Sequence, residues 1–258
     1  MQQKHSRFSL IKPKRLITSI KKYVVMSIGV AGLIFSPLSL TQENTRSIVN
    51  TKLQKVFGEQ GFVVTQHDEK LLEISVGGEF YYATPDARYI FAGTVFNTDS
   101  MQNISVLRKN RYRKEHLDSQ AKDRFISYPS NNEKHVVTIF TDIGCPYCRK
   151  MHEYMDEFNA LGITINYVMV PGGGKGSANY QKTMLAMCSK DPAEAINQAM
   201  ANKALSEQSC TEEGLFVKQE ALIDALKITN TPSIVLPNGE LRLGLTSPAQ
   251  LMSFIEQQ

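Results

Sequence analysis

Residues 138–151 of the chain read T-I-F-T-D-I-G-C-P-Y-C-R-K-M, and this stretch decides the fold of the C-terminal half. A β-branched and aromatic run over 136–141 leads into Cys145 and Cys148. Apolar residues follow at helical spacing, namely Met151, Met155 and Phe158. The pattern predicts a strand, a tight turn and a helix, with two thiols where the helix begins.

The position of the two cysteines favours thiol chemistry. Unpaired N–H groups and the positive end of the helix dipole stabilise an anion at the start of a helix. We therefore expect Cys145 to titrate below a free cysteine and to attack disulfides at neutral pH. Cys148 lies one turn further along and is expected to be the resolving thiol, which closes on Cys145 and releases a mixed disulfide.

A Cys-x-x-Cys pair can also form a purely structural disulfide or contribute to a zinc site. Zinc sites use four ligands, commonly in two close pairs, and Cys188 and Cys210 are too far apart in sequence to form a second one. His152, four residues after Cys148, could reach toward that thiol, but we expect it on the helix surface. Redox chemistry is favoured over both alternatives, and no metal and no cofactor are expected.

Charge is unevenly distributed along the 258 residues. Residues 1–40 hold seven of the 29 basic residues and none of the 25 acidic ones, so the remainder carries a net charge of −3, although the whole chain carries +4. The basic balance therefore gives no indication of nucleic-acid binding. An uncharged apolar run over 23–40 follows the basic residues, as in a secretory signal, and an uncleaved membrane anchor is the alternative.

The four cysteines form an even set, as is typical of an exported chain. With Cys145 and Cys148 as one pair, Cys188 and Cys210 are left. A disulfide between these two would stabilise the fold by roughly 3 kcal/mol according to the loop-entropy model. An oxidising compartment permits it, so we expect one structural pair and one catalytic pair.

Residues 43–103 are expected to form a small domain of one helix and an antiparallel sheet. A helix is predicted over 46–57, and strands are predicted over 62–66, 71–76, 79–83 and 89–95. Gly77-Gly78 between two strand patterns indicates a hairpin. A unit of this size buries little core alone, so we expect a homodimer, with strand 79–83 as a candidate edge for pairing.

A basic stretch over 104–125 follows, and we interpret it as a solvated connecting helix rather than a patch for an acidic partner. Residues 128–132 then mark a boundary. Beyond it the predicted order is strand, helix, strand, several helices, two strands and a last helix, which suits a mixed sheet flanked by helices. The predicted strands are 135–141, 163–170, 233–236 and 241–243.

Thr231-Pro232 comes directly before one of these strands, where proline cannot join a central ladder. Two interpretations stay open. In the first, the bond is cis, and its neighbouring backbone faces the thiols and receives an extended peptide. In the second, the pair is a plain turn before the strand. The glycine-rich segment 172–177 has Gly176 where a phosphate loop needs Ser or Thr after Lys175, so we expect a flexible loop.

Several of these segments together resemble the periplasmic DsbC/DsbG thiol:disulfide interchange proteins. They are F-T-D-I-G-C-P-Y-C at 140–148, N-A-L-G-I-T at 159–164, the pair Cys188 and Cys210, and T-P-S-I-V-L-P-N-G at 231–239. The N-terminal segment G-E-F-Y-Y-A-T-P-D-A-R-Y-I-F-A-G at 78–93 is similar to their dimerisation domain.

The resemblance implies an α+β protein with a signal peptide or N-terminal anchor over 1–42. A small cystatin-like dimerisation domain over 43–103 would follow, then a linker helix over 104–132 and a thioredoxin fold with a helical insertion over 133–258. Two chains would form a V-shaped homodimer in the periplasm. Its partners would be misfolded or mis-oxidised exported proteins and a membrane thiol reductase of the DsbD type.

The same resemblance implies roles for single residues. Cys145 would be the nucleophile and Cys148 the resolving thiol, with Cys188–Cys210 as a structural disulfide. The positions implied to contact the substrate are Pro146, Tyr147, Thr231 and Pro232.

Two features point in different directions within the family. The dipeptide Pro146-Tyr147 resembles DsbG more than DsbC, whereas the Cys188/Cys210 pair favours DsbC. Isomerisation of scrambled disulfides therefore stays open beside a DsbG-like reduction of oxidised cysteines with holdase activity. A holdase that does not use its thiols and a net oxidase are further alternatives.

Overall fold

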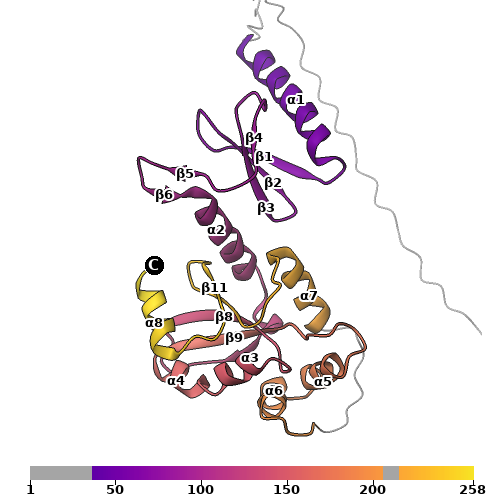
Figure 1. Ribbon diagram of the computed structural model, residues 1–258, viewed down its shortest axis with the longest axis vertical. Helices are drawn as coiled ribbons and strands as arrows, with labels where there is room; N and C mark the ends of the chain where they lie inside the picture. Colours follow the sequence, from indigo (N-terminus) through magenta and orange to yellow (C-terminus); the bar gives the residue numbers. More distant parts are fainter. Residues whose placement is uncertain (1–36, 206–214) are drawn as a thin grey trace, which may run out of the picture. The chain divides into compact units, whose positions relative to one another are not determined.

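A computed structural model describes residues 37–205 and 215–258 (Figure 1). Residues 1–36 of the expected signal or anchor segment over 1–42 lie outside the described residues, as does the expected disulfide partner Cys210. Backbone contacts divide the chain into residues 1–42 and 43–258. Within the described part, no helix is both long enough and apolar enough to cross a bilayer.

Helix α1 (Pro37–Phe57) packs against a four-stranded antiparallel sheet of order β1-β2-β3-β4 (Figure 1). Val49 and Leu53, one turn apart on α1, are buried in a cluster with the apolar side chains of the sheet, Leu72, Ile74 and Val76. The helix was predicted to begin at residue 46, and it begins at Pro37 instead. Proline fits the first turn of a helix, and neither glycine nor proline follows it before residue 46.

The four strands are β1 (Phe62–Gln66), β2 (Leu72–Val76), β3 (Glu79–Ala83) and β4 (Ile90–Phe91). Gly77 and Gly78 form the two-residue turn between β2 and β3, and their φ angles of 54° and 84° are both positive, as a type I′ hairpin requires. The predicted hairpin is therefore confirmed.

Two expectations for this sheet were wrong. Strand β3 pairs with β2 along its length and, through Tyr82 and Ala83, with β4 on the other side, so 79–83 is not an edge along its whole length. The strand predicted over 89–95 is limited to the two residues of β4, and a separate hairpin of β5 (Phe96–Asn97) and β6 (Gln102–Asn103) follows.

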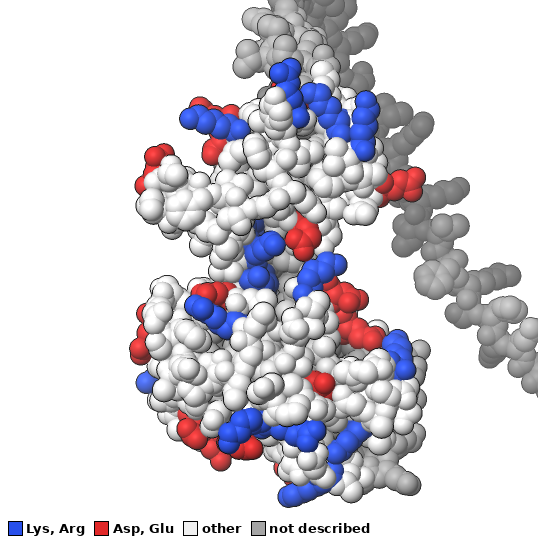
Figure 2. All heavy atoms as spheres, in the orientation of Figure 1, with Lys and Arg blue, Asp and Glu red and all other residues white. Residues whose placement is uncertain are grey.

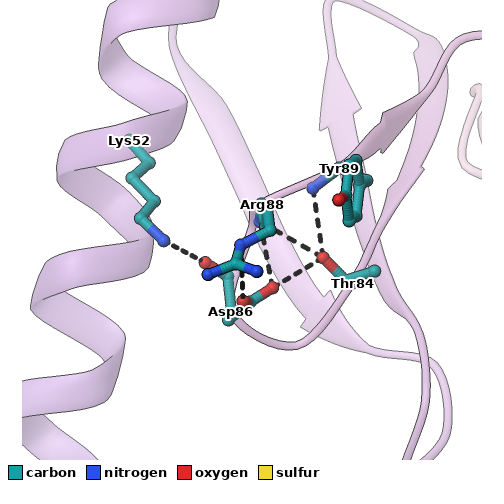
Figure 3. A network of polar contacts seen from close by, with 5 residues as sticks. All are labelled: Lys52, Thr84, Asp86, Arg88 and Tyr89. Carbon is teal, nitrogen blue, oxygen red and sulfur yellow. Dashed lines mark hydrogen bonds and ion pairs between the residues drawn. The ribbon is translucent and has the colours of Figure 1, made fainter.

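The turn between β3 and β4 is held by a network of polar contacts (Figure 3). The Thr84 hydroxyl donates to Asp86 Oδ1 over 2.7 Å, and the backbone N–H of Arg88 donates to the same carboxylate oxygen over 3.0 Å. Lys52 of α1 donates to the Asp86 carbonyl over 2.6 Å. These hydrogen bonds attach the turn to the helix.

Helix α2 (Ile104–Asp118) begins at Asn103, whose side chain accepts a hydrogen bond from the N–H of Val106 over 3.0 Å. It was predicted to continue to residue 125, and the family resemblance implied a linker helix over 104–132, but it ends at Asp118. A 3₁₀ turn, η1 (Lys122–Arg124), and strand β7 (Ile126–Tyr128) follow. The prediction failed because residues 126–128 pair with another strand far along the chain.

Three basic residues of α2 contact acidic side chains. Arg108 contacts Glu73 over 2.7 Å, Lys109 contacts Glu79 over 3.5 Å, and Lys114 contacts Asp118 over 2.6 Å. Acidic and basic side chains are interspersed on the face of the molecule that Figure 2 shows. These pairs fit the interpretation of a solvated helix and not of a patch for an acidic partner.

The C-terminal sheet has the order β11-β10-β8-β9-β7. Strands β8 (His135–Thr141) and β9 (Ile163–Met169) pair in parallel at its centre, and the other neighbours are antiparallel. The remaining two strands are β10 (Ser233–Val235) and β11 (Leu241–Leu243). The mixed sheet expected from the sequence is confirmed.

Helices cover both faces of this sheet. On one face, Val137 and Ile139 of β8 share a core with α3 (Pro146–His152), α4 (Met155–Ala160) and α8 (Pro248–Glu256). The same core includes side chains of α5 (Ala178–Met187) and α6 (Pro192–Met200). On the other face, Phe140 and Val168 pack with side chains of α7 (Leu215–Leu226). Helices α5, α6 and α7 lie between β9 and β10 in sequence.

Candidate active site

Cys145 lies where strand β8 has ended and helix α3 begins. It is the N-cap residue of α3, Pro146 follows at the first helical position, and the N–H of Arg149 donates to the Cys145 carbonyl over 3.1 Å. Cys145 is half-buried, and the side chain of Cys148 is 1% exposed. The predicted strand, turn and helix around the two thiols are confirmed.

The helix that carries the thiols is shorter than predicted. It was expected to continue to residues 161–162, but α3 ends at His152 and α4 begins at Met155. Between them, the N–H of Tyr154 donates to the Met151 carbonyl, three residues back, over 3.1 Å. This tighter turn interrupts the helix.

Cys148 is held as a neutral thiol. Burial raises its pKa to about 11, and the neighbouring Cys145 sulfur acts in the same direction. The side chains of Thr141 and Thr231 and the backbone of Asp142 oppose this shift. Cys148 is therefore mostly protonated at neutral pH.

Thr231-Pro232 lies next to the thiols. The peptide bond is cis, as the first of the two interpretations expected, whereas binding of an extended peptide there stays a prediction. The Thr231 carbonyl oxygen lies 3.6 Å from Cys145 Sγ, within hydrogen-bonding distance of the thiol. The Pro232 carbonyl instead accepts from the N–H of Gly244 over 2.9 Å. The two segments are thus brought together from positions 86 residues apart.

The surface beside this site is apolar and exposed. Tyr147, between the two cysteines, is 65% exposed. Leu243 and Leu245 flank Gly244, which bonds to Pro232, and they are 61% and 40% exposed. These side chains can contact an apolar segment of another protein.

Asp142, which the sequence did not single out, fixes the turn before Cys145. Its buried carboxylate accepts from the N–H of Gly144 and from the side-chain amide of Asn179, each over 2.8 Å. It also accepts from the N–H of Gly172 over 3.2 Å. A side chain at Gly144 would approach Asn179 to 2.8 Å, so only glycine fits there. The glycine-rich segment expected to be a loop therefore supports the thiol turn.

His152 was expected on the helix surface, and this was wrong. Its Nδ1 lies 3.1 Å from the hydroxyl of Tyr167, and its ring packs against the rings of Tyr128 and Tyr167. Burial lowers the pKa of His152, whereas the side chain of Asn197 opposes that shift. Strands β7 and β9 supply the two tyrosines, so no local pattern could have indicated the contact.

The structure describes three of the four cysteines and bears on the metal alternative. Cys145 and Cys148 are free thiols. Cys188 is disulfide-bonded, but the pairing with Cys210 stays a prediction because Cys210 lies outside the described residues. Across 37–205 and 215–258, no three His, Cys, Asp or Glu side chains are grouped as a metal site would need.

Comparisons with known proteins agree with this geometry. The family model of the thioredoxin-like domain matches residues 121–258. The thiol:disulfide interchange protein DsbC of Salmonella typhimurium is 34% identical over 176 residues, which cover 68% of this chain and 72% of the relative. DsbC of Pasteurella multocida is 31% identical over 235 residues, which cover 87% of this chain and 96% of the relative.

A DsbG protein is a more distant relative. The thiol:disulfide interchange protein DsbG of Pseudomonas aeruginosa is 22% identical over 261 residues, which cover 94% of this chain and 98% of that protein. The matches to DsbC are stronger and agree with the cysteine arrangement. The chain therefore belongs to the DsbC family of thiol:disulfide interchange proteins, and the expected thioredoxin-like fold and oxidoreductase class are confirmed.

Proposed function

We propose that this protein isomerises or reduces wrong disulfides of exported proteins in the periplasm, with Cys145 as nucleophile and Cys148 as resolving thiol. The observation that carries the proposal is the asymmetry of the two sulfurs. Cys145 is accessible and faces the Thr231 carbonyl, whereas Cys148 is buried and protonated. Only the first can meet a client disulfide.

The proposed reaction begins when the Cys145 thiolate attacks one sulfur of a client disulfide. A bond forms between Cys145 and the client, and the other client sulfur leaves as a thiolate. A second client thiol can then attack the mixed disulfide, which gives isomerisation. Alternatively Cys148 attacks Cys145, which releases a reduced client and leaves the two cysteines oxidised.

The client would lie as an extended segment beside Thr231 and Pro232, with Pro146 and Tyr147 contacting it on the helix side. The cis bond, the 3.6 Å contact to Cys145 and the exposed Tyr147 support this placement. The leucines of the β11 edge, Leu243 and Leu245, would extend the apolar part of the surface.

We further propose the division of labour that the sequence suggests. Residues 43–103 would assemble a homodimer, 104–132 would connect, and 133–258 would carry the exchange chemistry. Residues 1–42 would direct export or anchor the chain, and Cys188–Cys210 would be structural. A membrane thiol reductase of the DsbD type would return Cys145 and Cys148 to the dithiol, as isomerisation requires.

Single-cysteine variants test the two roles. With scrambled ribonuclease as client, Cys145→Ser should lose reactivation completely, because no accessible nucleophile is left. Cys148→Ala should keep the first attack and accumulate mixed disulfides, which can be seen on a non-reducing gel. Urea unfolding of both variants controls for the fold. Reactivation that survives Cys145→Ser would contradict the proposal.

A DsbG-like reductase with holdase activity has less support, since only Pro146-Tyr147 points to it. The substitution Pro146→Gly, assayed with scrambled ribonuclease and with a client carrying one sulfenic acid, measures what this residue contributes to each activity.

A further inference from the structure

The five-stranded sheet carries a pocket at the end away from the thiols. On the face that α7 covers, Phe140 and Val168 are buried beneath that helix. Toward the start of β8 the same face is open, and a pocket of about 500 Å³ lies between the sheet, the end of α2 and η1. Cys145 follows the opposite end of β8. Pockets of this volume commonly hold small organic molecules.

The floor of this pocket is polar. The strand register places Thr138 of β8 beside Asn166 of β9, and Asn166 beside Ser127 of β7. All three residues line the pocket. Two positions further along the same strands, Phe140 and Val168 are apolar, as a covered sheet face requires. The change from apolar to polar side chains therefore coincides with the pocket.

Two polar groups of the floor have no partner. Thr138 is 6% exposed, yet no hydrogen bond joins its hydroxyl to any residue that the structure describes, and the same is true of the Asn166 side-chain amide. The neighbouring hydroxyl of Thr164, by contrast, accepts from the N–H of Ser130 over 3.0 Å and donates to Glu133 over 2.6 Å. Burying a hydroxyl without a hydrogen bond costs free energy. The Thr138 hydroxyl is thus available to a molecule in the pocket.

The charges around the pocket favour an anion. Three lysines and two carboxylates line it, which gives a net charge of +1: Lys114, Lys122 and Lys134 against Asp118 and Glu133. Lys114 and Asp118 form an ion pair over 2.6 Å. Lys122 and Lys134 are exposed, and neither forms an ion pair within the described part of the chain. These two ammonium groups are therefore free to bind a negative charge.

We propose that this pocket binds a small organic anion that has an apolar ring or chain. Its anionic group would bind Lys122 and Lys134, and a polar atom would share a hydrogen bond with the Thr138 hydroxyl. The apolar part would contact the apolar side chains that line the same pocket, Leu117, Phe125, Leu236 and Pro237. Since neither cysteine of the thiol site takes part, the inference is independent of the proposed exchange reaction.

The probe for this site is 8-anilinonaphthalene-1-sulfonate, an aromatic anion whose fluorescence rises on binding. It is titrated into the full chain with both active-site thiols reduced. The double variant Lys122→Gln, Lys134→Gln should weaken binding roughly fivefold, because it removes the two free cations. Thr138→Val keeps the shape of the side chain and should weaken binding roughly three- to tenfold. Its midpoint of urea unfolding should be no lower than that of wild type, because the hydroxyl has no partner in the free protein.

Lys218→Gln, on the exposed surface of α7 and outside the pocket, is the matched control and should bind the probe as wild type does. Saturating probe should leave the rate at which Cys145 reacts with Ellman's reagent unchanged.

Three results would overturn the proposal. The first is a probe that does not bind, or that binds wild type and both pocket variants equally, since the pocket would then hold water only. The second is a slower reaction of Cys145 in the presence of the probe, which would place the probe at the thiol site. The third is a lowered urea midpoint in Thr138→Val, which would show that the hydroxyl already has a fixed partner.

Discussion

The two sheets of this protein bury their apolar side chains to different degrees. The five-stranded sheet is covered on both faces, and side chains such as Phe158 and Ile165 have no exposed surface. Around the four-stranded sheet the buried cluster is small, and large apolar side chains stay exposed, including Val63 at 64%, Tyr89 at 61% and Met101 at 71%. The apolar side chains of the five-stranded sheet are covered within one chain, whereas several of those around the four-stranded sheet are exposed.

This contrast fits the proposed division of labour. Exchange chemistry needs thiols held in fixed positions, which a closed core provides. Assembly needs apolar surface that is exposed in one chain and covered in the dimer. We therefore expect substitutions in the two regions to change the free energy of unfolding to different degrees.

The largest effect is expected in the core of the catalytic sheet. Phe158→Ala removes a side chain with no exposed surface and should lower the free energy of unfolding by roughly 3–5 kcal/mol. Phe96→Ala, in the β5–β6 hairpin, removes a ring that is 48% exposed and should cost less than about 1 kcal/mol within one chain. Urea unfolding measures both.

Measuring both variants at several protein concentrations tests the contrast between the two regions further. If a partner covers Phe96, the cost of Phe96→Ala should grow at high protein concentration, because only the dimer buries the ring. The cost of Phe158→Ala should not depend on concentration. Equal costs for the two variants at low concentration would refute the contrast between the regions.

The elements that the sequence predicted correctly depend on residues that lie close together in the chain. Strands β1, β3 and β8 were predicted with their observed bounds, because their β-branched and aromatic runs are bounded by turn residues. The thiol turn and the Gly77-Gly78 hairpin are equally local. Each depends on residues that are neighbours in the chain.

Three features that the sequence did not show depend on distant partners. The role of Asp142 depends on Gly172 and Asn179, which lie 30 and 37 residues away. His152 is half-buried against tyrosines of two other strands. Strand β7 exists because Ile126 and its neighbours pair with β9. No periodicity in the sequence carries such information.

Two glycines with positive φ offer a smaller test in each region. Gly239, in the turn after β10, has φ of 86°, and a Cβ there would overlap the Asn110 carbonyl oxygen of α2. Gly58, at the end of α1, has φ of 62°, and a Cβ added there would have no other atom within 4 Å. Gly239→Ala should cost roughly 2–4 kcal/mol, from the backbone and the overlap together. Gly58→Ala should cost about 1 kcal/mol, from the backbone alone.

Urea unfolding again measures the difference. The carbonyl of residue 239 accepts a hydrogen bond from Arg113 over 3.0 Å, and Gly239→Ala should displace it. Adding Arg113→Lys to the Gly239→Ala variant should therefore lower the stability little further. A Gly239→Ala variant no less stable than Gly58→Ala would show that α2 does not pack tightly on this turn.

The smallest effect on stability is expected in the exposed turn between β3 and β4, which is held by polar contacts (Figure 3). The pKa of Asp86 is lowered, first by the Thr84 hydroxyl and then by the N–H of Arg88. A carboxyl whose pKa is lower in the folded state stabilises the fold above its ordinary value of 3.8, and this contribution is lost as pH falls through the lowered pKa.

Asp86→Asn should therefore flatten the acid side of the pH dependence of thermal unfolding, with a small shift because the group is fully exposed. Thr84→Val removes the first donor and should move the Asp86 pKa back toward its ordinary value in a carboxyl titration by NMR. An Asp86 titration that is unchanged in Thr84→Val would show that the hydroxyl does not hold the carboxylate. The lowered pKa of Asp86 would then come from the N–H of Arg88 and the charges of Lys52 and Arg88, and the turn would keep its sensitivity to acid.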